Sequence, residues 1–158
     1  MSSPDTTTGT EAASVPPAPG ELRLEVVQVP VSDVDRAKEF YGGLGWREDA
    51  DFDLGGGVRV VQFTPPGSGC SIAFGTGITK MQPGSVERLE VAVHDINAAR
   101  EDLISKGADV SEVFHREGTE QLPGPDPEGR SYMTYASFSD PDGNGWLLQE
   151  IKERLPGR

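Results

Sequence analysis

The sequence predicts an α+β fold made of two βαβββ modules, and three observations lead to this fold class. A strand-then-helix pattern occurs twice, and the two copies lie 62 residues apart. Each copy is followed by three further segments with the alternating or apolar character of strands. At 158 residues the chain is too short for two independent domains of ordinary size, so the copies should be modules of one small domain.

The repeat is the strongest of these observations, because chance seldom produces so many matches. Residues 31–45 read VSDVDRAKEFYGGLG, and residues 93–107 read VHDINAAREDLISKG. The identical positions include the aspartates Asp33 and Asp95 and the glycines that end the two segments. The sequence therefore indicates an internal duplication.

Each copy has the signals of a strand that leads into a helix. Apolar residues alternate over 27–31 and over 89–93, a pattern typical of half-buried strands. Asp33 and Asp95 follow, and their carboxylates are placed to accept hydrogen bonds from the free N–H groups of a first helical turn. We expect the helices to bury Val34, Ala37, Tyr41 and Leu44 in the first copy and Ile96, Ala99 and Leu103 in the second.

The ends of the helices and the strands that follow complete each copy. Gly45 and Gly107 suit the left-handed residue that often ends a helix. Residues 117–130 hold three prolines and three glycines, so we expect a loop there, of a length often seen in binding lids. The expected strands are 46–52, 58–64 and 70–75 in the first copy and 109–114, 132–138 and 145–151 in the second.

The ends of the chain differ in composition from the repeats. Residues 1–20 consist almost wholly of small, proline and acidic residues, which cannot offset the entropy of ordering, so we expect a disordered tail. The remaining expected boundaries are a single domain over 21–152, with modules 21–77 and 86–152, and a C-terminal tail over 153–158.

Charge and composition narrow the classes of partner. The chain has 14 basic and 26 acidic residues, a net charge of −12, which would repel nucleic acids and anionic membranes. No apolar stretch approaches the roughly 20 residues that span a bilayer, and the N-terminus has no signal-peptide pattern. The single cysteine, Cys70, excludes an intramolecular disulfide, so we expect a reducing, cytoplasmic environment.

Two phrases in the sequence resemble signatures of the vicinal-oxygen-chelate superfamily, which includes glyoxalases, bleomycin-resistance proteins and extradiol dioxygenases. They are VSDVDRAKEFY at 31–41 and FSDPDGNGW at 138–146, and the resemblance covers about residues 22–151 with the duplication. It implies that the sheets of the two modules curl into a cup-shaped half-barrel that holds a small-molecule ligand. It also implies a homodimer.

The same resemblance implies a divalent metal held by His and Glu, but the usual ligand positions are changed. The first ligand stands seven residues before each capping aspartate, where this chain has Val26 and Arg88. The Glu stands seven residues after the first Asp of the DPDG turn, where this chain has Leu147. None of these side chains can ligate a cation. We therefore predict no metal cofactor, with Zn, Ni, Mn or Fe at a displaced set of ligands as the alternative.

Strand alternation indicates which side chains line the cup. The expected ligand-binding residues are Gln28, Arg88, Glu90, His115, Tyr135 and Gln149. Arg88 and Glu90 would be ion-paired neighbours that orient a carboxylate, carbonyl or phenol, and a buried Glu90 would be a candidate catalytic base. The alternative is that their strand lies at an edge and both side chains are solvated.

Three hypotheses follow for function. The first is a metal-independent binding protein of the bleomycin-resistance type that sequesters an aromatic or polyketide-like small molecule. The second is a lyase, isomerase or dioxygenase that uses Glu90 as base or recruits a metal through Glu90, His115 or Gln149. The third is a degenerate module that serves as a partner subunit.

Overall fold

The computed structural model describes residues 15–158. Most of the expected disordered tail, residues 1–14, lies outside the described residues. The chain forms two compact units, one ending at Lys80 and one beginning at Met81, and each unit carries one copy of the repeat. No helix among the described residues is long and apolar enough to cross a bilayer.

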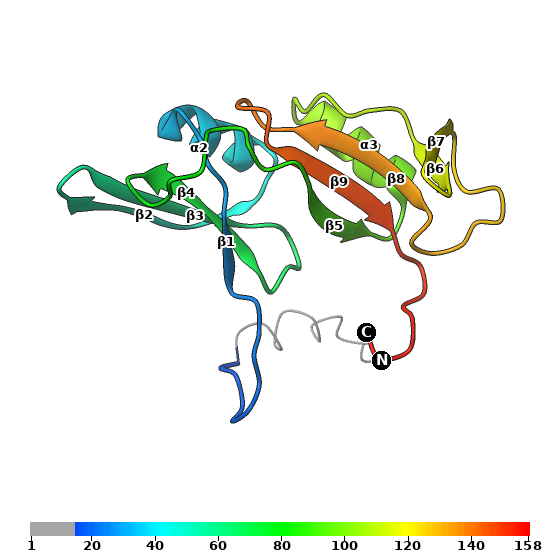
Figure 1. Cartoon of the computed structure of the whole chain (residues 1–158), viewed down its shortest axis with the longest axis horizontal. Coiled ribbons are helices and arrows are strands. Elements are labelled where there is room, and N and C mark those ends of the chain that lie inside the picture. The colour runs from blue at the N-terminus through cyan, green and yellow to red at the C-terminus, as the bar shows by residue number, and fades with distance from the viewer. Residues whose placement is uncertain (1–14) are drawn as a thin grey trace, which may run out of the picture. The chain divides into compact units, whose positions relative to one another are not determined.

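The first module is a four-stranded sheet with one helix (Figure 1). Its strand order is β1-β4-β3-β2, with β1 parallel to β4 and the other neighbours antiparallel. The elements are β1 (Val26–Gln28), α2 (Val34–Gly43), β2 (Arg47–Gly55), β3 (Val58–Thr64) and β4 (Ser71–Thr76).

The second module repeats this topology and adds one strand. Its order is β5-β9-β8-β6-β7, again with the first strand parallel to the last, and the α+β fold of two βαβββ repeats is thereby confirmed. The elements are β5 (Leu89–Val93), α3 (Ile96–Ser105), β6 (Phe114–Glu117), β7 (Glu120–Pro123), β8 (Thr134–Ser139) and β9 (Gly145–Glu150).

Both helices begin and end as the sequence predicts. The Asp33 carboxylate accepts a hydrogen bond from the Arg36 N–H at 3.0 Å, and Asp95 accepts from the N–H groups of residues 97 and 98. Gly45 and Gly107 follow the helices with φ of 83° and 97°. A side chain at either glycine would strain this left-handed backbone, which explains why glycine ends both copies.

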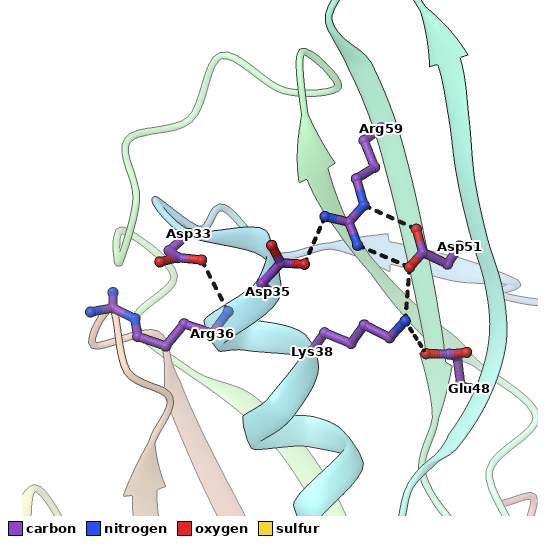
Figure 2. A network of polar contacts seen from close by, with 7 residues as sticks. All are labelled: Asp33, Asp35, Arg36, Lys38, Glu48, Asp51 and Arg59. Carbon is purple, nitrogen blue, oxygen red and sulfur yellow. Dashed lines mark hydrogen bonds and ion pairs between the residues drawn. The ribbon is translucent and has the colours of Figure 1, made fainter.

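The core of the first module lies between α2 and its sheet. Tyr41 of α2 is fully buried, and its ring lies 5.5 Å from that of Phe74, which stacks on Phe63 at 5.9 Å. At the edge of this core, charged side chains of α2 reach β2 and β3 (Figure 2). Lys38 binds Asp51 at 2.8 Å in this network.

One hydrogen bond shows which face of the second sheet α3 occupies. The backbone N–H of Ile96, the first residue of α3, donates to the Glu150 carboxylate of β9 at 2.9 Å. Alternate residues of β9 therefore point toward α3, and Leu148 and Trp146 are buried there. Leu147 and Gln149 point to the opposite face, which we call the pocket face.

The predicted strand over 109–114 is wrong for most of its length, since β6 begins only at Phe114. Residue Ser111 still follows β8: its N–H donates to the Ser137 carbonyl at 2.8 Å, and its hydroxyl accepts from the Ser137 N–H at 2.9 Å. A side-chain oxygen thus replaces one backbone acceptor, so the segment lies beside β8 without the regular backbone hydrogen-bond ladder of a strand.

The predicted loop over 117–130 is also corrected, because β7 lies inside it. β6 and β7 form an antiparallel hairpin in which Phe114 is opposite Pro123. Pro123 ends the outermost strand of the sheet, where a missing N–H costs no ladder bond. Gly118, with φ of 61°, forms the tight turn. Composition alone therefore misrepresented a short hairpin as a loop.

The remaining strands end within three residues of their predicted bounds. One difference has a clear cause. Tyr132 was expected to begin a strand, but its φ is 73°, the only positive value for a non-glycine residue among those described. β8 therefore starts at Thr134, after this turn.

Candidate ligand-binding site

Strand pairing places two rows of side chains on the pocket face. Tyr135 of β8 is opposite Gln149 of β9 on one side and Phe114 of β6 on the other. In the next row Leu147 is opposite both Glu90 and Ser137. Arg116, two residues beyond Phe114 on β6, points to the same face because side chains alternate along a strand.

A pocket of about 670 Å³ opens on this face. Its apolar lining includes Phe114 and Leu147, which are only 6% and 3% exposed. The polar and charged residues of the lining are Glu87, Arg88, Asp109, Ser111, Arg116, Gln121, Ser137 and Ser139. The lining thus joins buried apolar side chains to a larger number of polar and charged ones.

Three side chains of the pocket face form a stack. The rings of Phe114 and Tyr135 lie 5.6 Å apart at 25°, and the Arg116 guanidinium lies 5.6 Å from the centre of the Tyr135 ring. Within residues 15–158, the side chain of Arg116 makes no ion pair and no hydrogen bond. Its charge is therefore held against an aromatic face without a carboxylate partner.

Arg88 and Glu90 are neighbours on the pocket face, as expected, but their contact is loose. Arg88 Nε lies 3.5 Å from the Glu90 carboxylate, and each side chain is 47% exposed. Solvent screens a pair of this kind, so it contributes little to stability. Glu90 also lacks the burial that would make it an effective general base.

Tyr135 and Gln149 are held by one backbone group. The Tyr135 hydroxyl donates to the Tyr132 carbonyl at 2.7 Å, and Gln149 Nε2 donates to the same oxygen at 3.1 Å. The left-handed backbone of Tyr132 turns this carbonyl toward both side chains. These two expected site residues are thus fixed beside the pocket, although neither lines it.

The other two expected residues lie elsewhere. His115 is opposite Thr134, which faces α3, and it is 6% exposed with Nδ1 2.8 Å from the Gly124 carbonyl. It points away from the pocket face. Gln28 is exposed on β1 of the first module, on the sheet face that α2 does not occupy.

Sequence reasoning missed Phe114, Arg116, Gln121 and Ser137. The expected strand over 109–114 stopped where β6 begins, so the alternation of Phe114 and Arg116 was not followed. Gln121 lies in the segment 117–130, which the sequence predicts to be a loop. The available signal was the hairpin pattern itself, with Gly118-Thr119 between two runs of four residues.

Comparison with known proteins identifies the family. The family model described as the glyoxalase/bleomycin resistance protein/dioxygenase superfamily matches residues 23–148. The chain belongs to this superfamily. No curated protein sequence matches it significantly.

Solved structures of the superfamily resemble this chain over most of its length. TnmS3, an antibiotic binding protein from Streptomyces sp. CB03234, is 29% identical, with 84% of this chain and 98% of TnmS3 covered and a TM-score of 0.64. A glyoxalase/bleomycin resistance protein from the same strain is 30% identical, with 81% and 100% covered and a TM-score of 0.61. A superfamily member from Sphaerobacter thermophilus DSM 20745 is 28% identical, with 82% and 98% covered and a TM-score of 0.62.

The superfamily's divalent metal does not fit the residues of this chain. Val26, Arg88 and Leu147 stand at the expected ligand positions, and a valine, a leucine and a cation supply no donor. Within residues 15–158, no three His, Cys, Asp or Glu side chains gather closely enough to hold one ion. A displaced site built from Glu90, His115 and Gln149 is also disfavoured, because His115 lies on the opposite face of the sheet.

Proposed function

We propose that this chain is a small-molecule-binding protein of the bleomycin-resistance type, which sequesters an aromatic or polyketide-like ligand without a metal. The observation that carries the proposal is the pocket on the pocket face, in which the buried Phe114 and Leu147 lie among polar and charged side chains. Its volume of about 670 Å³ falls in the range usual for drug-sized ligands.

The likeness to TnmS3 supports binding rather than turnover. That protein is described as antibiotic binding, and it shares 29% of its sequence with this chain over nearly its whole length. By analogy, sequestration here would lower the free concentration of a toxic compound and so protect the cell. A cytoplasmic homodimer is the form in which we propose that the protein acts, and light scattering of the purified full chain tests the dimer.

A lyase, isomerase or dioxygenase activity is the alternative, and the geometry gives it less support. Glu90 is the one carboxylate proposed as a base, and it is half exposed and loosely paired with Arg88. Glu90 is therefore exposed to water, whereas a carboxylate that acts as a general base is usually held in a dry environment. The residues at the superfamily's metal positions supply no donor atoms that would hold a Lewis-acidic metal ion.

The test uses emodin, an aromatic polyketide, and protein treated with a chelator and then dialysed. We expect saturable binding by calorimetry, a change in tryptophan fluorescence, since Trp146 is among the residues that line the pocket, and recovery of unchanged emodin. Chelator treatment should leave the affinity unaltered. Absence of binding to emodin and to other aromatic polyketides would refute the proposal, as would a turnover that stops when a stoichiometric metal is removed.

A further inference from the structure

We propose that the pocket selects planar aromatic ligands that carry one negative charge, and that Arg116 binds the anionic group. This inference rests on the proposed function and specifies its ligand class. Three observations support it: the cavity, the stack of Arg116, Tyr135 and Phe114, and the distribution of charge around them.

Arg116 differs in its ion pairing from three other arginines of the second module. Arg88, Arg100 and Arg130 each have a carboxylate within 4 Å. Arg116 has none among residues 15–158, although the chain carries a net charge of −12. A guanidinium has five N–H donors, and contact with the face of Tyr135 uses none of them. These donors are available to a ligand.

The position of Arg116 joins this charge to an aromatic surface. Arg116 lies two residues from Phe114 on β6, and Gln121 of β7 is directly opposite Arg116. A ring system lying over Phe114 and Leu147 would therefore direct a carboxylate substituent toward the guanidinium and the Gln121 amide. Because the guanidinium already lies over the Tyr135 ring, less entropy is lost when the two hydrogen bonds to a carboxylate form.

Acidic residues of the pocket fix the direction of the ligand. Glu87 and Asp109 line the pocket from the segments before β5 and after α3, whereas Arg116 lies on β6. A second negative group at the end near β5 would meet these carboxylates. The Glu90 carboxylate also faces Arg88 there, which leaves that cation partly neutralised. The charges thus favour a monoanion whose acid group points to β6.

The experiment compares three naphthalene compounds with the same ring system and substituents of different charge: 2-naphthoate, 2-naphthalenemethanol and the cation of 2-naphthylmethylamine. Calorimetry on the full chain should show 2-naphthoate binding about tenfold or more tightly than the alcohol, as one charge-assisted bidentate contact allows, with the amine weakest. Added salt should weaken binding of the naphthoate and leave the alcohol unchanged.

Variants assign the effect to one residue. Arg116→Gln should reduce the affinity for 2-naphthoate to that for the alcohol, and leave the affinity for the alcohol within about twofold, since only the charge-assisted contact is lost. Arg116→Lys should restore part of the preference, because it returns the charge but not the planar fork. Arg154→Gln, at an exposed arginine of the C-terminal tail outside this pocket, is the control and should change nothing.

Results other than these would each contradict a different part of the proposal. Equal binding of acid and alcohol, or loss of affinity for both compounds in Arg116→Gln, would refute anion selection while leaving an aromatic-binding pocket. Tightest binding of the amine would show that Glu87 and Asp109 dominate instead. Failure of all three compounds, together with failure of emodin, would refute the proposed function itself.

Discussion

Arg59 of β3 donates two hydrogen bonds to the carboxylate of Asp51 on β2, from Nε to Oδ1 at 3.0 Å and from Nη2 to Oδ2 at 2.9 Å (Figure 2). The same guanidinium reaches Asp35 of α2 at 2.9 Å, and Lys38 of α2 also binds Asp51. Arg59 and Lys38 hold the pKa of the Asp51 carboxyl well below its usual range. The network thus ties the helix to both strands of the hairpin.

We expect Arg59→Met to lower the melting temperature of the chain by several degrees. The substitution keeps an apolar stem but leaves Asp51 with Lys38 as its only cationic partner, and bidentate pairs are the strongest of their kind. Thermal unfolding followed by circular dichroism at low salt measures the change. Arg36→Met, on the exposed side of the same helix, is the control (Figure 2). Equal melting temperatures for the two variants would show that the network is only a solvated surface cluster.

A second carboxylate makes stability depend on pH. Asp126 is buried and accepts hydrogen bonds from Nε, Nη2 and the backbone N–H of Arg130, and these bonds lower its pKa from 3.8 to about 2. Because the folded-state pKa is the lower one, the stabilisation is complete above the ordinary value of 3.8 and is lost as the pH falls toward about 2. We expect the wild type to lose stability in this window.

The Asp126→Asn variant tests this assignment. It should be less stable than the wild type at neutral pH, and the difference should narrow steadily below pH 3.8, since asparagine does not titrate. Urea unfolding at a series of pH values measures both slopes. Asp53→Asn, an exposed site in the first module, serves as control. A difference that stays constant down to pH 2 would remove Asp126 as the cause.

Asn144 is the buried centre of the turn before β9. Its side chain is fully buried, donates to the Asp140 carboxylate at 2.8 Å and accepts from the Val86 N–H at 3.2 Å. Asn144→Ala removes both of these side-chain bonds from a buried turn, so we expect a loss of about 2–3 kcal/mol in unfolding free energy. Chemical denaturation measures the loss. The exposed Asn97→Ala should show none, and similar stability of the two variants would contradict the role of this turn.

Much of the fold could be predicted from the duplicated segments, because local chemistry determines it. Asp33 and Asp95 cap helices through their own carboxylates, and Gly45 and Gly107 end them through backbone conformation. These signals need no knowledge of distant residues. The bounds of β3, set by its apolar residues and by Pro65-Pro66-Gly67 after it, were equally local.

The site was harder to predict, because its geometry depends on register between strands distant in sequence. Arg116 joins the pocket only because β6 pairs with β8 and brings Tyr135 beneath it. His115 was expected to be near the ligand, yet a shift of one residue along the strand turns its ring toward α3. Tyr132 adopts a left-handed backbone that no sequence pattern indicated.

The pocket can be closed from within by one substitution. Ser137 is opposite Leu147 on the pocket face and is half-buried, whereas its neighbours Ala136 and Phe138 are buried on the side of α3. Ser137→Phe should place a ring in the space proposed for the ligand while leaving the packing against α3 unchanged. The affinity for 2-naphthoate and for 2-naphthalenemethanol should each fall by about tenfold or more, as expected when a steric block removes most of the apolar contact.

Calorimetry with both compounds separates this effect from that of Arg116, which should act on the acid alone. The exposed Ser105→Phe on α3 adds the same ring outside the pocket and controls for nonspecific changes. The melting temperature of Ser137→Phe should stay near that of the wild type, because the new ring meets open space rather than packed core. Undiminished binding of both compounds to a folded Ser137→Phe variant would contradict this placement of the ligand, since the new ring would occupy the space over Leu147.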